Sequence, residues 1–226
     1  MAKVFGFTGE ISAGKTTAAR MVHEVSGVKD GIHLEFSDTV ISVARTWMGR
    51  IAIDTSSLDR TSMNEGLREA VFDTFGLSLD VDRLDRFSLN ELNDYLAFRT
   101  DISLDSIDIS VESKDIHRPL LQWIGHEFTA KYDANFWSNS IASAIRRSQD
   151  VGLITVGGVR YDSNAVMVRE SGGKIISILR PGHGTVEPQS HRSERGINAS
   201  LIDSYIDNSG TLNDLRASID DLWRKP

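Results

Sequence analysis

Apolar positions recur along the chain with two periods, which predict strands alternating with helices. Short apolar runs predict strands at residues 3–7, 33–37, 152–157, 174–179 and 204–207. Apolar residues at helical spacing predict helices at residues 16–22, 39–48, 118–145, 164–171 and 211–223, the third being broken near residues 132–135. This alternation predicts an α/β fold, with a parallel β-sheet flanked by helices on both faces.

The alternation is interrupted between residues 51 and 114, which we interpret as an inserted substrate-covering region. The insertion is rich in Asp and Ser, with helical patches at residues 64–75 and 89–98 and a half-exposed strand at residues 101–111. The core of a single domain would then comprise residues 1–50 and 115–226. Residues 181–198 form a second irregular segment, which we predict to be a lid.

The turn after the first predicted strand carries the strongest chemical signal. Residues 9–16 satisfy the pattern GxxxxGK[ST], placed between a buried strand and a helix. Backbone N–H groups of such a turn, together with the positive end of the helix dipole, bind a phosphate group. Lys15 is therefore predicted to act on the β- and γ-phosphates of ATP, and Thr16 to bind Mg²⁺. The ATP-binding residues expected from this turn are Gly9, Ala13, Gly14, Lys15, Thr16 and Thr17.

Arginines near strand ends are the next candidates, because phosphoryl transfer needs placement and positive charge more than covalent chemistry. Arg160 is a catalytic candidate, and Arg180 a candidate for binding ATP. Arg192, in the predicted lid, is a further catalytic candidate, and His191 and Glu194 lie beside it. Solvated surface arginines and local hydrogen bonds in a loop remain the alternative interpretation.

Two other positions are candidates for the acceptor side. Asp38 follows the predicted strand at residues 33–37, where α/β folds place their ligands. Arg118 and Gln122 lie four residues apart on a predicted helix and share a face, as a clamp for the phosphate and base of a nucleoside monophosphate would. An exposed polar face would explain the spacing of Arg118 and Gln122 equally well.

Composition limits the partners, the metal sites and the cellular compartment that fit this chemistry. The chain of 226 residues has a net charge of −7, which disfavours a nucleic acid as the partner. It has no cysteine, which excludes disulfides and thiolate metal sites. We expect a soluble cytoplasmic protein, because no apolar run approaches the length of a membrane span and the first strand leaves no room for a signal peptide.

Several of these features, in this order, resemble the phage-type deoxynucleoside monophosphate kinases among the P-loop nucleotide kinases. The resembling segments are residues 9–16, 118–125, 135–137, 159–160, 171–176, 180–181, 191–194 and 207–212. Together they cover residues 1–50 and 115–226, whereas residues 55–112 match no family by this comparison. The resemblance implies a P-loop kinase fold and transfer of the ATP γ-phosphate, with Mg²⁺, to a deoxynucleoside monophosphate in the cytoplasm, that of the host if the chain is phage-encoded.

The resemblance also implies roles for particular residues. It places Arg118, Gln122 and Trp137 on the acceptor, and His191 and Glu194 in or beside the lid. The sequence is compatible with a homodimer.

Two positions depart from the family pattern. An Asp usually found at the end of the third strand is Gly158 here, and a Glu expected shortly afterwards is Asn164. The lost carboxylate is replaced by Asp162 or by Asp38, or the metal rests on Thr16 and phosphate oxygens. We favour Asp38 as the metal ligand, because it is predicted to end a strand beside the phosphate-binding turn.

Two rival functions stay open. The chain could be a P-loop kinase that acts on a modified base in DNA, for which the unmatched region leaves room. It could instead be a nucleotide-binding protein that has lost kinase activity, since both departures remove a carboxylate. Dephospho-coenzyme A kinases share the phosphate-binding turn, but residues 118–137 and 191–194 fit them less well.

Overall fold

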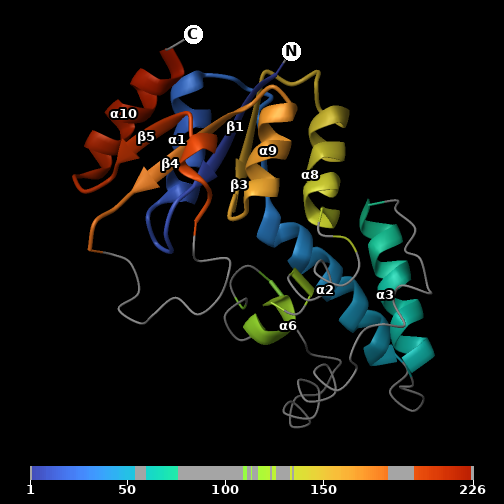
Figure 1. The fold of residues 1–226 in the computed structure, drawn as a ribbon. Coiled ribbons are helices and arrows are strands. Elements are labelled where there is room, and N and C mark those ends of the chain that lie inside the picture. The colour runs from blue at the N-terminus through green and yellow to red at the C-terminus, as the bar shows by residue number, and fades with distance from the viewer. Residues whose placement is uncertain are drawn as a thin grey trace. The chain divides into compact units, whose positions relative to one another are not determined.

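The computed structural model describes most of the chain in two compact units. The described residues are 2–53, 60–75, 109–110, 113, 117–122, 124–125, 133, 135–182 and 196–224. The first unit consists of residues 1–36 and 138–226, and the second of residues 37–137. The described elements of both are drawn in Figure 1.

A five-stranded parallel sheet forms the centre of the first unit. Its strands are β1 (Lys3–Thr8), β2 (Ile32–Glu35), β3 (Leu153–Gly157), β4 (Lys174–Leu179) and β5 (Ser204–Asp207). They lie in the order β2-β3-β1-β4-β5, and every neighbouring pair is parallel. The predicted α/β fold with a parallel sheet is therefore confirmed.

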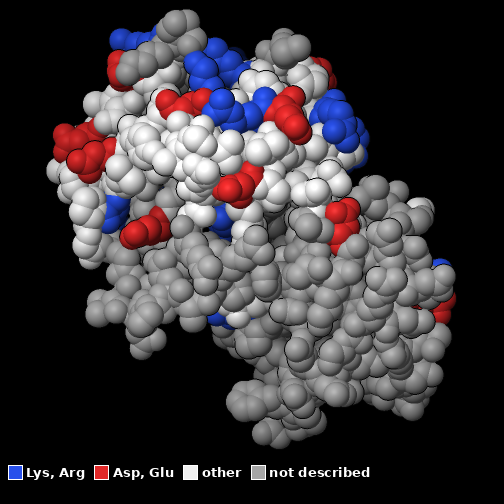
Figure 2. All heavy atoms as spheres, in the orientation of Figure 1, with Lys and Arg blue, Asp and Glu red and all other residues white. Residues whose placement is uncertain are grey.

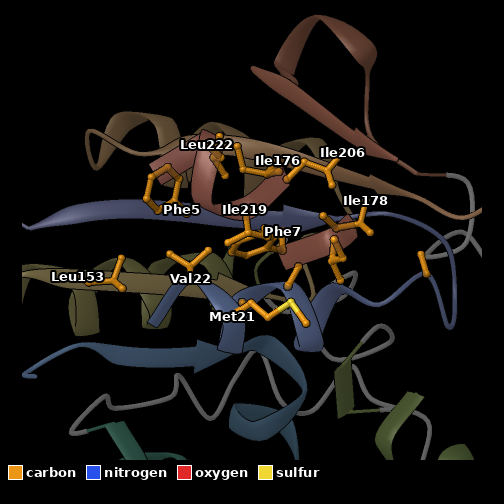
Figure 3. Packing of buried hydrophobic residues seen from close by; sticks show 14 residues of the cluster. Phe5, Phe7, Met21, Val22, Leu153, Ile176, Ile178, Ile206, Ile219 and Leu222 are labelled. Carbon is orange, nitrogen blue, oxygen red and sulfur yellow. The ribbon is translucent and has the colours of Figure 1, made fainter. Parts of the chain in front are cut away.

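Helices cover both faces of this sheet. On one face, α1 (Lys15–Ser26) and α10 (Leu212–Arg224) pack against each other and against alternate residues of the strands (Figure 3). This core consists mainly of Phe5, Phe7, Leu153, Ile176, Ile178 and Ile206 from the sheet, and of Ala18, Met21, Val22, Leu215, Ile219 and Leu222 from the two helices. On the other face, α9 (Asp162–Glu170) packs against β1 and β4. Because the chain leaves β1 and β3 toward opposite faces, a crevice at their carboxyl ends is the expected position of a ligand.

The order of helices and strands follows the sequence prediction, but several boundaries differ. Helix α1 extends beyond its predicted end to Ser26, where Gly27 terminates it with a φ of 66°. The predicted helical region from residue 118 to residue 145 contains α6 (Arg118–Gln122) and α8 (Phe136–Arg147). Of the predicted strand at residues 101–111, Ile109 and Ser110 are described and are not in a strand. The predicted helix at residues 89–98 and most of that strand lie outside the described residues.

The second unit contains α3 (Arg60–Phe75) and most of α2 (Phe36–Ile53). Trp47 of α2 is buried, and its indole ring lies against Gly66 of α3, where a larger residue would be crowded. Arg45 Nε donates a hydrogen bond of 2.7 Å to the carbonyl oxygen of Ile109. The small size of Gly66 therefore allows α3 to lie close to the Trp47 ring of α2.

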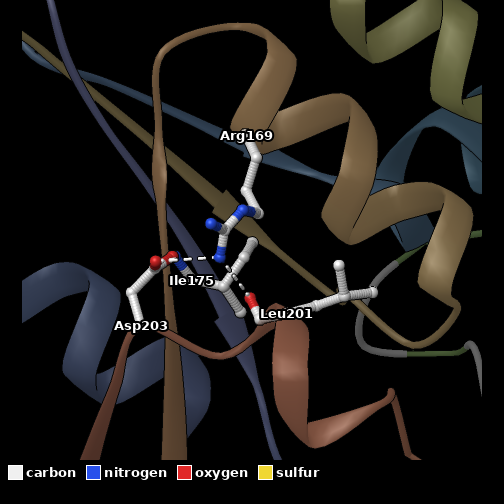
Figure 4. A network of polar contacts seen from close by, with 4 residues as sticks. All are labelled: Arg169, Ile175, Leu201 and Asp203. Atoms are coloured by element: carbon white, nitrogen blue, oxygen red, sulfur yellow. Dashed lines mark hydrogen bonds and ion pairs between the residues drawn. The ribbon is translucent and has the colours of Figure 1, made fainter.

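A polar network lies at the amino-terminal ends of β4 and β5, which is the end of the sheet opposite the expected ligand crevice (Figure 4). Arg169 of α9 donates to the carbonyl oxygen of Leu201 and forms an ion pair with Asp203, at 3.2 and 2.8 Å. The second carboxylate oxygen of Asp203 accepts a hydrogen bond from the backbone N–H of Ile175, at the start of β4. The network joins α9 to the 3-10 helix η5 (Ala199–Leu201) and to β4.

The surface of the described residues carries both signs of charge. In the view of Figure 2, lysines and arginines are interspersed with aspartates and glutamates rather than gathered by sign. Among the described residues, no helix combines the length and the apolar character that crossing a membrane requires.

Candidate active site

The turn between β1 and α1 directs the start of α1 toward the carboxyl edge of the sheet. Gly9 and Gly14 have φ angles of 139° and 97°, which residues with a side chain rarely adopt. A Cβ at Gly9 would also collide with the carbonyl oxygen of Ile178 in β4. Helix α1 has a glycine, Gly14, at its N-cap, which offers no side chain to the first N–H groups of the helix. Its first N–H groups and its positive dipole end are therefore suited to bind an anion.

A cavity of about 310 Å³ lies against this turn. It is lined by Ser12, Gly14, Lys15, Thr16, Thr17 and Arg180. The ammonium group of Lys15 donates to the carbonyl oxygens of Gly9 and Glu10, at 2.9 and 2.6 Å, so it is held within the turn. Arg180 Nη1 lies 3.5 Å from the carbonyl oxygen of Ser12. The structure thus brings most of the predicted ATP-binding residues together around one cavity.

Asn208, at the end of β5, supports the same turn from outside the motif. Its buried side-chain amide donates a hydrogen bond of 2.8 Å to the carbonyl oxygen of Ala13. The same nitrogen occupies the space that a Cβ at Gly14 would need. Residue 208 was part of a resembling segment, but its role was not predicted. The available signal was a polar residue directly after a predicted strand, at the end of the sheet where ligands bind.

A second turn, between β3 and α9, carries Arg160. The backbone N–H of Val159 donates to the carbonyl oxygen of Phe7 at 3.2 Å, which places this turn beside the end of β1. Asn164 Oδ1 accepts hydrogen bonds from the backbone N–H groups of Arg160 and Tyr161, at 3.3 and 3.1 Å. The exposed Arg160 side chain therefore projects from a turn that a buried amide fixes.

Both ends of the Asn164 amide form hydrogen bonds. Asn164 Nδ2 donates a hydrogen bond of 2.9 Å to the hydroxyl of Ser138, at the start of the first unit's part of α8. With a carboxylate at this position the direction of the contact would reverse, because the Ser138 hydroxyl would have to donate. Asp162, one of the two predicted replacements for the lost carboxylate, accepts a hydrogen bond of 2.7 Å from the backbone N–H of Asn198.

The end of β2 differs from the sequence prediction, which placed Asp38 directly after this strand. The strand ends at Glu35, so Asp38 does not end a strand but lies in the first turn of α2, where an acidic residue interacts favourably with the helix dipole. Asp38 also belongs to the second unit, whereas Glu35 belongs to the first. The Glu35 side chain is 16% exposed, and its carboxylate lies 3.4 Å from His33 Nε2.

Two histidines connect this carboxylate to the helix behind the phosphate-binding turn. His33 Nδ1 and His23 Nε2 both lie 2.8 Å from the buried hydroxyl of Thr155 in β3. Burial, with a smaller contribution from the nearby His33, lowers the pKa of His23 from its usual value of 6.5. A neutral His23 can accept a hydrogen bond from the Thr155 hydroxyl while the same hydroxyl accepts a hydrogen bond from His33.

The remaining predicted site residues belong to the second unit or lie outside the described residues. Arg118 and Gln122 are the first and last residues of α6, and both are exposed. Trp137 is 6% exposed, and its ring packs edge-on against that of Phe136, with centroids 4.9 Å apart. His191, Arg192 and Glu194, like most of the predicted lid at residues 181–198, lie outside the described residues.

Fold and site together define the class of protein. A parallel α/β sheet whose central strand leads through a glycine-rich turn into a helix is consistent with a P-loop kinase. A comparison with family models gives the particular family, because the model for deoxynucleotide monophosphate kinase matches residues 58–219. The chain belongs to this family, and its activity is that of a nucleotide kinase. No curated protein matches the chain.

The matched range adds information to the sequence comparison. It includes residues 58–112, which the resemblance described above had left unassigned. It begins after the phosphate-binding turn at residues 9–16, so this turn and the family match are separate lines of evidence.

Proposed function

We propose that this protein transfers the γ-phosphoryl group of ATP to a deoxynucleoside 5′-monophosphate, giving ADP and the deoxynucleoside diphosphate. The observation that carries the proposal is the cavity at the N-terminus of α1, where a lysine, an arginine and the first backbone N–H groups of the helix converge. Such a site suits a polyanionic donor, and the family match supplies the acceptor class.

The donor would be held by residues of the first unit. Lys15 would contact the β- and γ-phosphates, and Arg180, which also lines the cavity, would contact ATP. The hydroxyl of Thr16 fits a Mg²⁺ ion, because Mg²⁺ prefers oxygen ligands and takes most of them from water and phosphate. Mg²⁺, when bound, would neutralise charge on the phosphate oxygens. The second ligand that the sequence predicts is Asp38.

The transfer needs no general base. An ionised phosphate oxygen of the acceptor would attack the γ-phosphorus in line, while the bond to the β,γ-bridging oxygen breaks and ADP leaves with its electron pair. Arg160 and Arg192 would neutralise the transferred group, as positive charge at that position lowers the barrier.

The proposed acceptor-binding residues are those that the sequence predicts. Arg118 would hold its phosphate and Gln122 its base, with Trp137 supporting them, and His191 and Glu194 would contact it from the lid. Exposure of Arg118 and Gln122 at the two ends of α6 is compatible with this role. We propose the cytoplasm as the setting, that of the host if the chain is phage-encoded, and a homodimer is compatible with these roles.

A direct assay tests the proposal. The purified chain is mixed with ATP, Mg²⁺ and each deoxynucleoside monophosphate in turn, and ADP and diphosphate are quantified. Lys15→Ala should lower turnover by at least roughly a hundredfold, because it removes the positive charge nearest the phosphates. The matched control is Lys3→Ala, since Lys3 lies over the Trp223 ring at 4.3 Å, away from the cavity.

The same assay separates the rival functions. Phosphate incorporated into duplex DNA, with no mononucleotide phosphorylated, would favour the kinase of a modified base. Tight ATP binding without transfer to any acceptor would favour a protein that has lost its activity. Full turnover in Lys15→Ala would contradict the assignment of the phosphate-binding turn.

A further inference from the structure

The carboxylate of Glu35 occupies space that side chains would fill in other sequences. Glu35 and Gly157 are register partners at the carboxyl ends of β2 and β3. A Cβ built on Gly157 would collide with Glu35 Oε2, and one built on Gly158 would collide with Oε1. Two successive glycines therefore make room for this carboxylate, which bends across the end of β3.

This position brings Glu35 close to the phosphate-binding turn. The residue after the glycine pair, Val159, donates its backbone N–H to the carbonyl oxygen of Phe7, two residues before Gly9. Since neighbouring strands lie about 4.8 Å apart, a carboxylate above the end of β3 is about one strand spacing from the end of β1. Glu35 is therefore at the crevice between the strands from which α1 and α9 depart.

The surroundings of Glu35 leave its negative charge only partly compensated. Its side chain is 16% exposed, and among the described residues its one ion-pair partner is His33, at 3.4 Å. His33 is itself fixed by the Thr155 hydroxyl, which also contacts His23 of α1. A carboxylate that is largely removed from water and oriented in this way is stabilised by a further cation.

A merely structural ion pair would explain these contacts less well. An exposed His33–Glu35 pair could form on the solvent side of β2 without crossing the neighbouring strand, and would require no glycine at position 157. The observed carboxylate instead lies on the edge of the sheet where the cavity and Arg160 also lie.

We propose that Glu35 supplies the carboxylate that holds the hydrated Mg²⁺ ion of the bound nucleotide, through a water ligand of the metal. This inference rests on the proposed function. It assigns to the end of β2 the role that sequence reasoning gave to Asp38. Mg²⁺ usually keeps several waters, so a carboxylate one strand away from the phosphate-binding turn is at a suitable distance for such a contact.

The test measures nucleotide binding rather than turnover. Isothermal titration calorimetry gives the ATP affinity of the wild type with Mg²⁺ and with EDTA, and the ratio of the two is the metal-dependent gain. Glu35→Gln should reduce this gain by about tenfold or more, as loss of groups that hold a metal's ligands does, while leaving the affinity in EDTA unchanged. A thermal melt shows whether the variant is folded.

A relocated carboxylate provides the sharper test. Glu35→Ala opens the space beside Gly157, so Gly157→Asp in that background returns a carboxylate to nearly the same place. The double variant should recover part of the metal-dependent gain, whereas Glu35→Ala combined with Gly157→Asn should not. The asparagine has the same size without the charge, so it controls for packing.

The outcomes distinguish this inference from the proposed function. If the wild type binds no ATP under either condition, the proposed function fails. If the wild type shows the gain and Glu35→Gln keeps it, the inference on Glu35 fails while the proposed function stands. Loss of the gain in Asp38→Asn but not in Glu35→Gln would return the role to Asp38.

Discussion

Two turns at the carboxyl edge of the sheet differ in how they are held. The turn from β1 to α1 and the turn from β3 to α9 each contain a glycine with positive φ, Gly14 and Gly158, and each is fixed by a buried asparagine. In the first turn the asparagine, Asn208, comes from the far end of the chain. In the second turn it is Asn164, four residues from the arginine that the turn carries.

The comparison shows that the contacts that fix a turn can come from far away in the sequence. The first turn is recognisable from its own residues, yet its carbonyl at Ala13 depends on a hydrogen bond formed 195 positions away in sequence. The second turn has no recognisable motif but is capped locally by Asn164, whose amide also contacts Ser138, and its Val159 N–H donates to the carbonyl oxygen of Phe7. A strong motif therefore does not imply a self-supporting turn.

The largest difference between the turns should appear on removal of the arginine. Arg160→Ala should lower kcat by about 10²–10³-fold, because a charge aimed at the transferred phosphate acts mainly in the transition state. ATP affinity should change little, since the cavity is lined by the other turn. Single-turnover kinetics with calorimetry for ATP measures both. Arg216→Ala is the control, because Arg216 forms an exposed ion pair with Glu24 on the opposite region of α1.

The support of the first turn can be removed separately. Asn208→Asp replaces the donor that contacts the Ala13 carbonyl by an acceptor, at a cost of about 1–3 kcal/mol in the free energy of unfolding. We expect weaker ATP binding with kcat less affected. Asn198→Asp is matched, because Asn198 Oδ1 accepts from the backbone N–H of Ser200 and an aspartate keeps that acceptor. Equal ATP affinities in the two variants would contradict a role for Asn208 in the turn.

The support of the second turn should give the opposite kinetic result. Asn164→Ala removes the one oxygen that accepts from two backbone N–H groups and leaves Ser138 without the amide that donates to it, at a cost of about 1–2 kcal/mol, as for the loss of a helix cap. We expect kcat to fall while ATP affinity is kept, because the turn carries Arg160. Urea unfolding and the same kinetic assays separate these effects. A variant that loses ATP affinity instead would show that the two turns are not independent.

The sequence predicted the fold and the first turn because both depend on local patterns. Apolar runs identified the strands of the sheet, and a contiguous motif identified residues 9–16. It missed the roles of Asn208, Asn164 and Glu35, whose partners lie in other segments. It also misplaced Asp38 at a strand end, because Phe36 continues the apolar run while already beginning α2. Residues that act through tertiary contacts leave no periodic signal, so their roles required the structure.

The smallest expected effect concerns the Thr155 hydroxyl, which joins β3 to α1. Thr155, two residues before Gly157, contacts His23 of α1, and burial lowers the pKa of His23 below its usual 6.5. The unfolded chain therefore binds a proton more readily than the folded one, so stability should fall as pH decreases from 6.5 toward the lower folded pKa. His23→Gln removes the titration while keeping an amide able to contact Thr155. Urea unfolding at pH 7.5 and 5.5 should show a smaller loss of unfolding free energy in this variant than in the wild type. Equal losses would mean that protonation of His23 does not affect the contact between α1 and β3.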